Sequence, residues 1–229
     1  MKSQKVAIFD IDGTIFRSSL LIQVTDGLVE KGIMPKKIKH KYELAHKQWL
    51  DREGPYEDYI DAVIKAFVKN IKGVSQKEFL KVAEQVVSKQ HHRIYRYTRD
   101  LVKDLKKKKY FMLAISHSPK DILDEFCEEL GFDKVYGQIY EVQNNKYSGK
   151  TLYRNLILEK SKILQRAIEK EGLSLRGSIG VGDTESDSSF LRKVDNPICF
   201  NPNQELYKIA QRNKWQIVVE RKNVIYKIK

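Results

Sequence analysis

The chain has 229 residues, of which 41% are hydrophobic and 32% are charged, a balance typical of a globular protein rather than a disordered one. No apolar run approaches the roughly 20 residues that a membrane-spanning helix needs. The segment Met1–Asp10 turns acidic too early for a signal peptide. Cys127 and Cys199 are far apart in apolar surroundings, so we expect buried free thiols rather than a disulfide framework. These features predict a cytoplasmic protein without a transmembrane segment.

The net charge of +13 exceeds what solubility requires, and it leaves two interpretations open. It can mark a surface for nucleic acid or for an acidic membrane, or it can reflect lysines spread over solvated helix faces. The run Lys106–Lys109 favours the second interpretation, because it ends a predicted helix where cations meet the negative end of the helix dipole. It also lacks the interleaved aromatic residues on which single-stranded nucleic acid stacks. A nucleic-acid partner therefore stays an alternative that we do not favour.

The first predicted element is a buried strand at residues 6–9, and a long helical insertion follows it. Between this strand and the next, apolar stripes at helical spacing stop at Gly32 and Gly73, which are typical helix ends. An insertion of this length is expected to form a small all-helical domain. The predicted division is a core of residues 1–18 and 93–229 with a helical domain of residues 19–92.

After the insertion, short apolar runs alternate with helical patterns. The predicted strands are 111–115, 178–181, 197–200 and, at the sheet edge, 217–219. The predicted helices are 118–131, 156–172 and 203–214. Ser118 is the expected N-cap of the first of these helices, and Asn144-Asn145 between 138–142 and Tyr147 predicts a β-hairpin. Strands that alternate with helices predict an α/β fold with a doubly wound parallel sheet.

Two carboxylates follow the first strand, in the motif Asp10-Ile11-Asp12-Gly13-Thr14. Side chains at positions i and i+2 of a strand share a face, and this pair lies where the strand ends. Neighbouring carboxylates repel each other unless a cation lies nearby or one of them is protonated. The pair therefore predicts either metal ligands or a general acid with a raised pKa. The alternative is an ordinary acidic turn.

A second acidic motif, Gly182-Asp183-Thr184-Glu185-Ser186-Asp187, follows the strand predicted at 178–181. Taken alone it carries little information, because acids are common in the first turn of a helix. Ser116, at the end of the strand predicted at 111–115, is equally ordinary by itself.

Lys160 is unusual because of the face on which it lies. It is four residues from both Leu156 and Leu164, which places it on the apolar side of the predicted helix. Buried lysines are rare unless an anion pairs with them. The alternative is a lysine whose stem reaches out to water.

The placement of these residues connects them. Asp10, Ser116 and Asp183 each follow a predicted parallel strand, so they meet at the carboxyl edge where open α/β sheets bind ligands. Carboxylates that hold a hard cation, together with a lysine and a hydroxyl that grip an anion, make up a phosphoryl-transfer site.

In order and spacing, the motifs Asp10–Thr14, Ser116, Lys160 and Gly182–Asp187 resemble the four motifs of the haloacid dehalogenase superfamily. The helical insertion between the first two motifs is similar to that family's C1 cap. Asn201-Pro202-Asn203 followed by a helix resembles its phosphoserine-phosphatase-like branch, subfamily IB. The resemblance spans essentially the whole chain, and it implies a Rossmann-like core with an inserted helical cap.

The resemblance also implies an activity, that of a Mg2+-dependent phosphomonoester hydrolase with an aspartyl-phosphate intermediate. Asp10 would be the nucleophile and Asp12 the general acid and base, while Ser116 and Lys160 would contact the phosphoryl oxygens. The implied Mg2+ ligands are Asp10, the backbone carbonyl of Asp12, and Asp183, with Asp187 either a ligand or one step removed. Halide displacement is disfavoured, because dehalogenases of this fold lack the second aspartate.

The expected substrate is a small phosphorylated metabolite. The alternatives are a larger anionic substrate, such as a nucleic-acid end or a lysophospholipid, or a basic nucleic-acid-binding protein on a phosphatase scaffold. Phosphoserine phosphatases carry a glutamate nine residues after the nucleophile, where this chain has Ser19. We therefore expect phosphoserine to be a poor substrate, and Arg17 with a basic cap to favour a neutral or anionic alcohol. The alternative is that Asp26 or Glu30 replaces the missing glutamate. The oligomeric state is not predicted.

Overall fold

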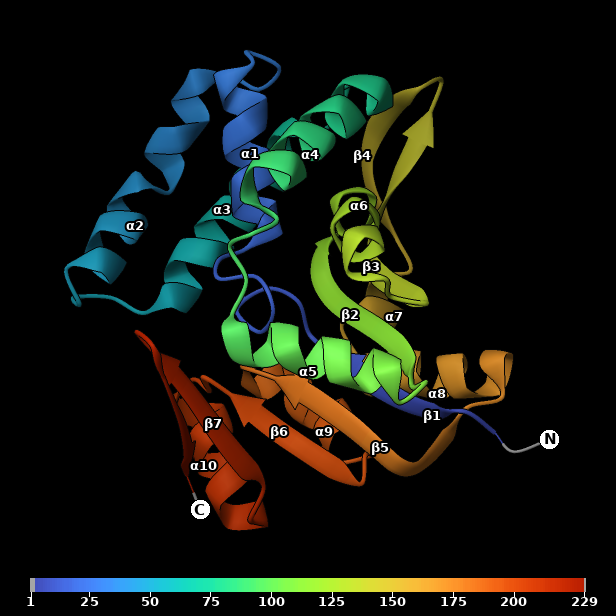
Figure 1. Ribbon diagram of the computed structural model, residues 1–229. Helices are drawn as coiled ribbons and strands as arrows, with labels where there is room; N and C mark the ends of the chain where they lie inside the picture. The colour runs from blue at the N-terminus through green and yellow to red at the C-terminus, as the bar shows by residue number, and fades with distance from the viewer. Residues whose placement is uncertain (1–2, 229) are drawn as a thin grey trace.

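The computed structural model describes residues 3–228, and within them it contains one eight-stranded sheet in the order β4-β3-β2-β1-β5-β6-β7-β8 (Figure 1). The strands are β1 (Lys5–Phe9), β2 (Phe111–Pro119), β3 (Lys134–Gln143), β4 (Lys146–Leu152), β5 (Ser174–Gly182), β6 (Asn196–Phe200), β7 (Gln216–Arg221) and β8 (Val224–Ile228). The six inner strands pair in parallel, and β4 and β8 are antiparallel to their neighbours. The predicted α/β fold class is confirmed.

Helices cover both faces of this sheet. The core helices are α5 (Arg96–Lys107), α6 (Lys120–Leu130), α7 (Arg154–Ile157), α8 (Lys160–Glu171), η2 (Glu185–Asp187), α9 (Ser188–Leu191) and α10 (Gln204–Asn213). Alternate residues of β1 face opposite layers: Phe9 packs in the cluster that contains α5 and α6, and Ile8 packs in the cluster that contains α8, α9 and α10. This alternation follows from the two-residue repeat of a strand, and it makes the sheet doubly wound.

The insertion between β1 and β2 is entirely helical, and it stands above the carboxyl edge of the sheet (Figure 1). Its helices are α1 (Leu20–Glu30), η1 (Lys36–Lys41), α2 (Glu43–Leu50), α3 (Tyr56–Asn70) and α4 (Gln76–Gln90). The two segments that join it to the core run side by side, because Arg17 N–H donates to Arg93 O and Tyr95 N–H donates to Ile15 O, both at 2.9 Å. The chain thus leaves and returns at one point, close to the predicted boundaries at residues 18 and 93.

The insertion also rests on the hairpin of β3 and β4. Tyr147 N–H donates to Val74 O at 2.9 Å, and Gly73 N–H donates to Tyr147 O at 2.8 Å. The ring of Phe67 packs edge-on against Tyr140, with centroids 5.3 Å apart. One hydrophobic cluster therefore runs from the inner helices of the insertion through the hairpin to α6.

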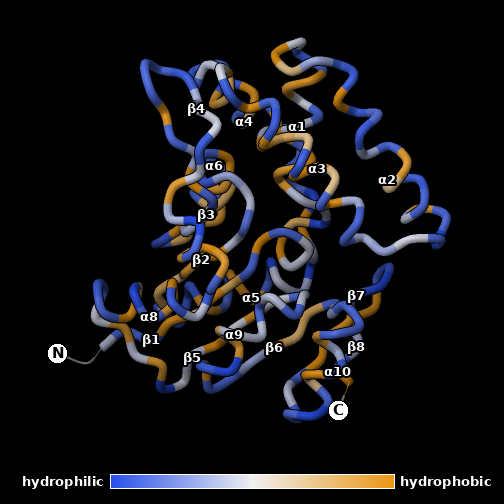
Figure 2. The backbone as a smooth tube through the Cα atoms, turned by 180° about the vertical axis from the view of Figure 1, so that it is seen from behind, coloured by the Kyte–Doolittle hydropathy of each residue, from blue (hydrophilic) through white to orange (hydrophobic). Residues whose placement is uncertain are grey.

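The outer helix α2 differs from its neighbours, because none of its residues is buried. In Figure 2 its trace alternates between hydrophilic and hydrophobic residues, and the hydrophobic side chains of Leu44 and Leu50 are exposed. The insertion thus has a packed inner layer and an exposed outer segment.

Four local predictions are wrong. The helix predicted from Ser118 begins at Lys120 without a side-chain cap, because β2 continues to Pro119 and the Ser118 hydroxyl instead accepts a hydrogen bond from Leu21 N–H at 3.2 Å. Ser116 therefore lies inside β2 rather than after it. The helix predicted at 156–172 is broken into α7 and α8. Finally, β7 is not the edge strand, since β8 pairs outside it.

The other predicted strands and the hairpin turn at Asn144-Asn145 lie where the sequence places them. Both cysteines are free and buried, as predicted. Among residues 3–228, no helix combines the length and the apolar character that a membrane crossing requires.

Candidate active site

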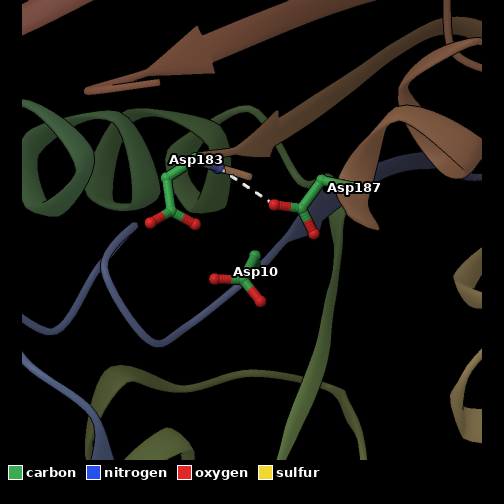
Figure 3. A group of neighbouring side chains, drawn as sticks. All are labelled: Asp10, Asp183 and Asp187. Carbon is green, nitrogen blue, oxygen red and sulfur yellow. Dashed lines mark hydrogen bonds between the residues drawn. The ribbon is translucent and has the colours of Figure 1, made fainter. Parts of the chain in front are cut away.

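Three carboxylates meet where β1 and β5 end, at the centre of the sheet's carboxyl edge. Asp10 directly follows β1, Asp183 directly follows β5, and Asp187 lies in η2 one turn later. Their side chains converge (Figure 3), and one oxygen atom of each lies within 4.8 Å of the others. The Asp187 carboxylate is held in place by the backbone, since its Oδ2 accepts hydrogen bonds from Asp183 N–H at 3.0 Å and Thr184 N–H at 3.1 Å.

Two glycines allow this close approach. Gly13 has a φ of +82°, and a Cβ atom at this position would collide with the Asp183 carboxylate. A Cβ atom at Gly182 would come within 2.5 Å of the Asp187 side chain. The glycines of both motifs are therefore required by the packing of the acidic group itself.

Lys160 is the first residue of α8, and its ammonium group lies between the carboxylates of Asp10 and Asp187. The side chain is 2% exposed, and Nζ donates to Asp10 Oδ1 at 2.7 Å and to Asp187 Oδ1 at 2.5 Å. Burial alone would lower the pKa of this lysine, but the carboxylates of Asp10 and Asp187 raise it above its ordinary value. Lys160 is therefore a permanent cation at the base of the site, and the predicted buried pairing is found.

Asp12 lies apart from the cluster of three acids. Its Oδ1 accepts from Leu20 N–H at 2.6 Å and its Oδ2 accepts from the Ser116 hydroxyl at 2.5 Å. Burial raises the pKa of Asp12 above the usual value, while the hydrogen bond from Ser116 opposes this shift. A carboxyl group with a raised pKa, held at the edge of the cluster, suits proton transfer. The side chain of Asp12 is not among the acids that could hold a metal together.

Burial of the acidic cluster disfavours the ionised carboxylates, so the pKa values of Asp10 and Asp183 are raised. The pKa of Asp10 is raised from 3.8 to about 7, chiefly by burial; the nearby Lys160 opposes this shift and Asp187 adds to it. The pKa of Asp183 is raised well above its usual value, first by burial and then by Asp10. Oδ2 of Asp10 is buried and has no hydrogen-bond partner among the described residues. An oxygen-rich cluster of this kind, with an unpartnered buried carboxylate oxygen, fits a hard divalent cation such as Mg2+.

A cavity of about 680 Å3 lies between the sheet edge and the helical insertion. Its core side includes Asp10, Asp12, Lys160 and Asp183. Ser116 does not line it, because that side chain is fully buried beneath Asp12. The serine of β2 that lines the cavity is Ser118, two residues later.

The segment that joins core and insertion contributes a further cation. Arg17 lines the cavity, and its guanidinium lies over the ring of Tyr95, 5.4 Å from the centroid. Ser19, where a relative with phosphoserine activity would carry its glutamate, is buried and also lines the cavity. Asp26 lines it as well, whereas Glu30 borders a different, smaller cavity.

The wall contributed by the insertion was not predicted. Its aromatic members are His46, Trp49, Tyr56 and Tyr59, and its acidic members are Asp26, Glu57 and Asp61. No lysine or arginine of residues 19–92 lines the cavity. The prediction that the cap presents a basic surface to the substrate is therefore wrong. The sequence indicates only part of this wall: Tyr56, Ile60 and Ile64 are four residues apart and so share one face of a helix.

Comparisons with known proteins agree with this geometry. Residues 7–192 match the family model described as haloacid dehalogenase-like hydrolase. The chain is 23% identical over 210 residues to a phosphoserine phosphatase of Archaeoglobus fulgidus, covering 91% of this chain and 56% of that protein. It is 23% identical over 231 residues to a histidinol-phosphatase of Neisseria meningitidis, covering 94% of this chain and 98% of that protein.

A solved structure described as a phospho-aspartyl intermediate analogue of phosphoserine phosphatase superposes with a TM-score of 0.62 at 22% identity, covering 96% of this chain and 95% of that one. At this identity the likeness shows the fold. The family match spans more than half of the chain and includes the four motifs Asp10–Thr14, Ser116, Lys160 and Gly182–Asp187, whereas Asn201-Pro202-Asn203 lies beyond it. The chain belongs to the haloacid dehalogenase-like hydrolase family.

Proposed function

We propose that this protein is a Mg2+-dependent phosphatase of small phosphomonoesters that acts through an aspartyl-phosphate on Asp10. The observation that carries the proposal is the buried Asp10 carboxylate, which faces a cavity with one oxygen unpartnered. Lys160 and two further carboxylates surround it. The proposal is supported by the family match and by two relatives that are named as phosphatases.

The first step is a displacement at phosphorus. An Asp10 carboxylate oxygen forms a bond to phosphorus while the bond from phosphorus to the ester oxygen breaks. Asp12 donates its proton to the departing alcohol, for which the raised pKa of its carboxyl group is suited. Lys160 stays protonated and balances negative charge on the transferring group and on Asp10.

The second step returns the enzyme to its starting state. Asp12, now ionised, accepts a proton from water, whose oxygen attacks phosphorus. The bond between phosphorus and Asp10 breaks, inorganic phosphate leaves, and Asp12 again carries a proton. Ser116 holds the Asp12 carboxyl group in position for both transfers through its hydrogen bond to Oδ2.

We propose that Asp10 and Asp183, with the backbone carbonyl of Asp12, hold Mg2+. The ion, when bound, neutralises the charge that would otherwise repel an anionic phosphoryl group from Asp10. Asp187 also accepts hydrogen bonds from Lys160 and from two backbone N–H groups. These contacts leave it less free to turn toward an ion, so we assign it the role of orienting Lys160 and the loop of Asp183.

We further propose that residues 19–92 act as a cap over the core of residues 1–18 and 93–229. The cap supplies one wall of the cavity, and the two joining segments lie side by side. A cap that closes on the substrate excludes water from the site during the first step.

A larger anionic substrate is less well supported. The cap wall presents carboxylates to the cavity, which would repel a nucleic-acid end. Basic side chains gather instead in a separate groove between η1 and α3, lined by Lys37, His40, Lys41, Lys65 and Lys69. Binding there would fall steeply with added salt, and an affinity that does not change with salt would exclude it.

The proposal is tested by trapping the intermediate. Acid quenching during turnover of a phosphomonoester with Mg2+, followed by peptide mass spectrometry, should find one phosphoryl group on the peptide that contains Asp10. With an aryl phosphate, whose leaving group departs without a proton from Asp12, Asp12→Asn should increase the trapped fraction, because the second step loses its base. An unmodified peptide in both proteins, at a quench time within the first turnover, would contradict the assignment of Asp10 as nucleophile.

A further inference from the structure

The cap wall of the catalytic cavity contains four aromatic side chains, two from α2 and two from α3. The rings of Trp49 and Tyr59 are nearly parallel, with centroids 6.0 Å apart and planes at 18°. His46 stacks on Tyr59 at 4.5 Å and 24°. Tyr56 meets Trp49 and Tyr59 edge-on, at 63° and 81°. Such clusters bury apolar groups, and the faces of their rings attract cations.

Two carboxylates border these rings. Glu57 and Asp61 are one helical turn apart on α3, and both line the cavity. Neither forms an ion pair with any described side chain, and Glu57 Oε1 accepts a hydrogen bond from the neutral amide of Asn203 at 3.3 Å. Asp61 lies at the rim, where it also borders the groove next to η1. The wall therefore presents two carboxylates without an ion-pair partner among the described residues beside the aromatic side chains.

Asp26 differs from these two acids. Lys39 Nζ lies 3.3 Å from its Oδ1, and the Tyr42 hydroxyl donates to the same oxygen at 2.9 Å. Its charge is thus balanced within the cap. Glu57 and Asp61 are the acids that remain to contact a ligand.

Positive charge lies on the opposite side of the cavity. Lys160 belongs to the core and Arg17 to the segment that leads into the cap. Lysines and arginines outnumber acids in residues 19–92, yet only acids among the charged cap residues reach the cavity. The two cationic side chains of the cavity therefore lie on its core side, among the catalytic carboxylates, whereas the cap side is aromatic and acidic.

Given the phosphatase function proposed above, we infer that the alcohol part of the substrate is an organic ammonium ion that lies against Trp49, Tyr56, Glu57 and Asp61. The phosphate group would then lie toward Lys160 and Arg17, and the ammonium group toward the two carboxylates. A neutral planar alcohol would use the rings and leave the carboxylates without a partner. An anionic alcohol would be repelled by them.

The inference is tested with two esters that differ only in charge. Phosphocholine and 3,3-dimethylbutyl phosphate have the same shape, with nitrogen replaced by carbon. We expect kcat/KM with Mg2+ to be about tenfold higher for phosphocholine, as one cation against aromatic faces and partly exposed carboxylates would give. Phosphoethanolamine separates the two kinds of ammonium: a primary ammonium depends more on the carboxylates, and a quaternary one depends more on the rings.

Variants of the wall sharpen this test. In Glu57→Gln with Asp61→Asn, the ratio of kcat/KM between the charged and the neutral ester should fall toward one. Asp58→Asn is the matched control, because Asp58 lies on the same helix but lines the outer groove instead of the cavity, and it should leave the ratio unchanged. A wild-type ratio near one, or a higher kcat/KM for adenosine monophosphate or 3-phosphoglycerate, would overturn the inference.

A binding measurement separates this inference from the catalytic proposal. The chain has two tryptophans, and Trp215 lies outside the cavity beneath Arg192. In Asp10→Asn with Trp215→Phe, Trp49 becomes the single fluorescent reporter of the cap wall. Phosphocholine should change its emission at a lower concentration than 3,3-dimethylbutyl phosphate. If the wild type hydrolyses no ester, the proposed function fails, and this titration still decides the charge preference; equal affinities would reject it.

Discussion

The floor and the cap wall of the cavity are built in different ways. On the floor, Asp10, Asp187 and Lys160 are almost fully buried, and each is fixed by hydrogen bonds to neighbouring groups. On the wall, Glu57 and Asp61 are exposed and have few partners. The floor suits one chemical step that must be held in a fixed geometry, whereas the wall can vary without disturbing it. Chemistry and selectivity are therefore separable in this molecule.

The largest effect is expected where the floor loses its nucleophile. Asp10→Asn keeps the shape of the side chain but removes its charge and nucleophilicity, so kcat should fall at least about a thousandfold. The matched control is Asp58→Asn, which removes a carboxylate that lines only the outer groove. Steady-state assays of both variants check this. Retention of more than a few per cent of the activity in Asp10→Asn would remove Asp10 from the role of nucleophile.

Removal of divalent cations should lower the rate of hydrolysis almost as strongly as the loss of the nucleophile. The three carboxylates are close enough to share one ion, and we expect chelation with EDTA to abolish hydrolysis and added Mg2+ to restore it. The measurement is the initial rate before chelation, after it and after readdition. An undiminished rate after thorough chelation would show that these acids work without a metal.

A smaller effect is expected from a single added methyl group on the floor. In Gly13→Ala the Cβ atom meets the Asp183 carboxylate, so the affinity for Mg2+ should fall about 10- to 100-fold. Gly32→Ala is the control, because Gly32 also has a positive φ, of 71°, but its Cβ atom would lie in open space. Isothermal titration of both variants with Mg2+ compares them. An affinity of Gly13→Ala equal to that of Gly32→Ala would contradict the predicted clash with the Asp183 carboxylate.

The charge of the floor should also make stability depend on pH. In the metal-free protein, the pKa of Asp10 is raised from 3.8 to about 7, chiefly by burial. The folded state therefore keeps a proton that the unfolded chain releases, and the free energy of unfolding should fall as the pH rises from about 4 to about 7. Melting in EDTA measures this slope, which should be shallower in Asp10→Asn and in wild type with Mg2+. Parallel slopes for wild type and variant would contradict the shift.

The smallest effect concerns motion of the wall. Because α2 buries no residue while α4 buries Phe79, Val82, Ala83 and Val87, backbone amides of α2 should exchange with solvent about tenfold faster. A phosphate analogue with Mg2+ should slow exchange in α2 more than in α4 if the outer segment closes on the substrate. Hydrogen exchange by mass spectrometry checks both points. Uniform exchange across the cap would instead favour movement of the whole insertion.

The residues of the floor could be predicted from the sequence because the patterns that identify them lie within short segments of the chain. Asp10 and Asp183 each follow a short apolar strand, and parallel strands bring their carboxyl ends to one edge. Lys160 was predictable from helical spacing, although the helix that carries it starts at that residue and not before it. Ser118 was misassigned because a serine before a proline is a typical N-cap, whereas here Leu21 of the cap competes for its hydroxyl.

The wall could not be predicted in the same way. Its rings come from α2 and α3, and their meeting depends on how the chain turns through Gly54 and Pro55. The net charge of the insertion was also misleading, because the sequence reports its total and not the direction in which each side chain points. Three acids, Asp26, Glu57 and Asp61, line the cavity, whereas none of the lysines of the insertion reaches it and several of them line the outer groove. Such a distribution is a tertiary property.

The hairpin of β3 and β4 has a consequence for synthesis of the chain on the ribosome. The cap helices are made first, but their apolar partners in α6 and in the hairpin follow after residue 119. Between the end of α4 and the end of β4, translation takes on the order of 3–12 s. During that interval Phe67 and Phe79 lack the tyrosines that later cover them. A chain that stalls within this stretch would expose an apolar surface, and chaperones that act on nascent chains would bind to it.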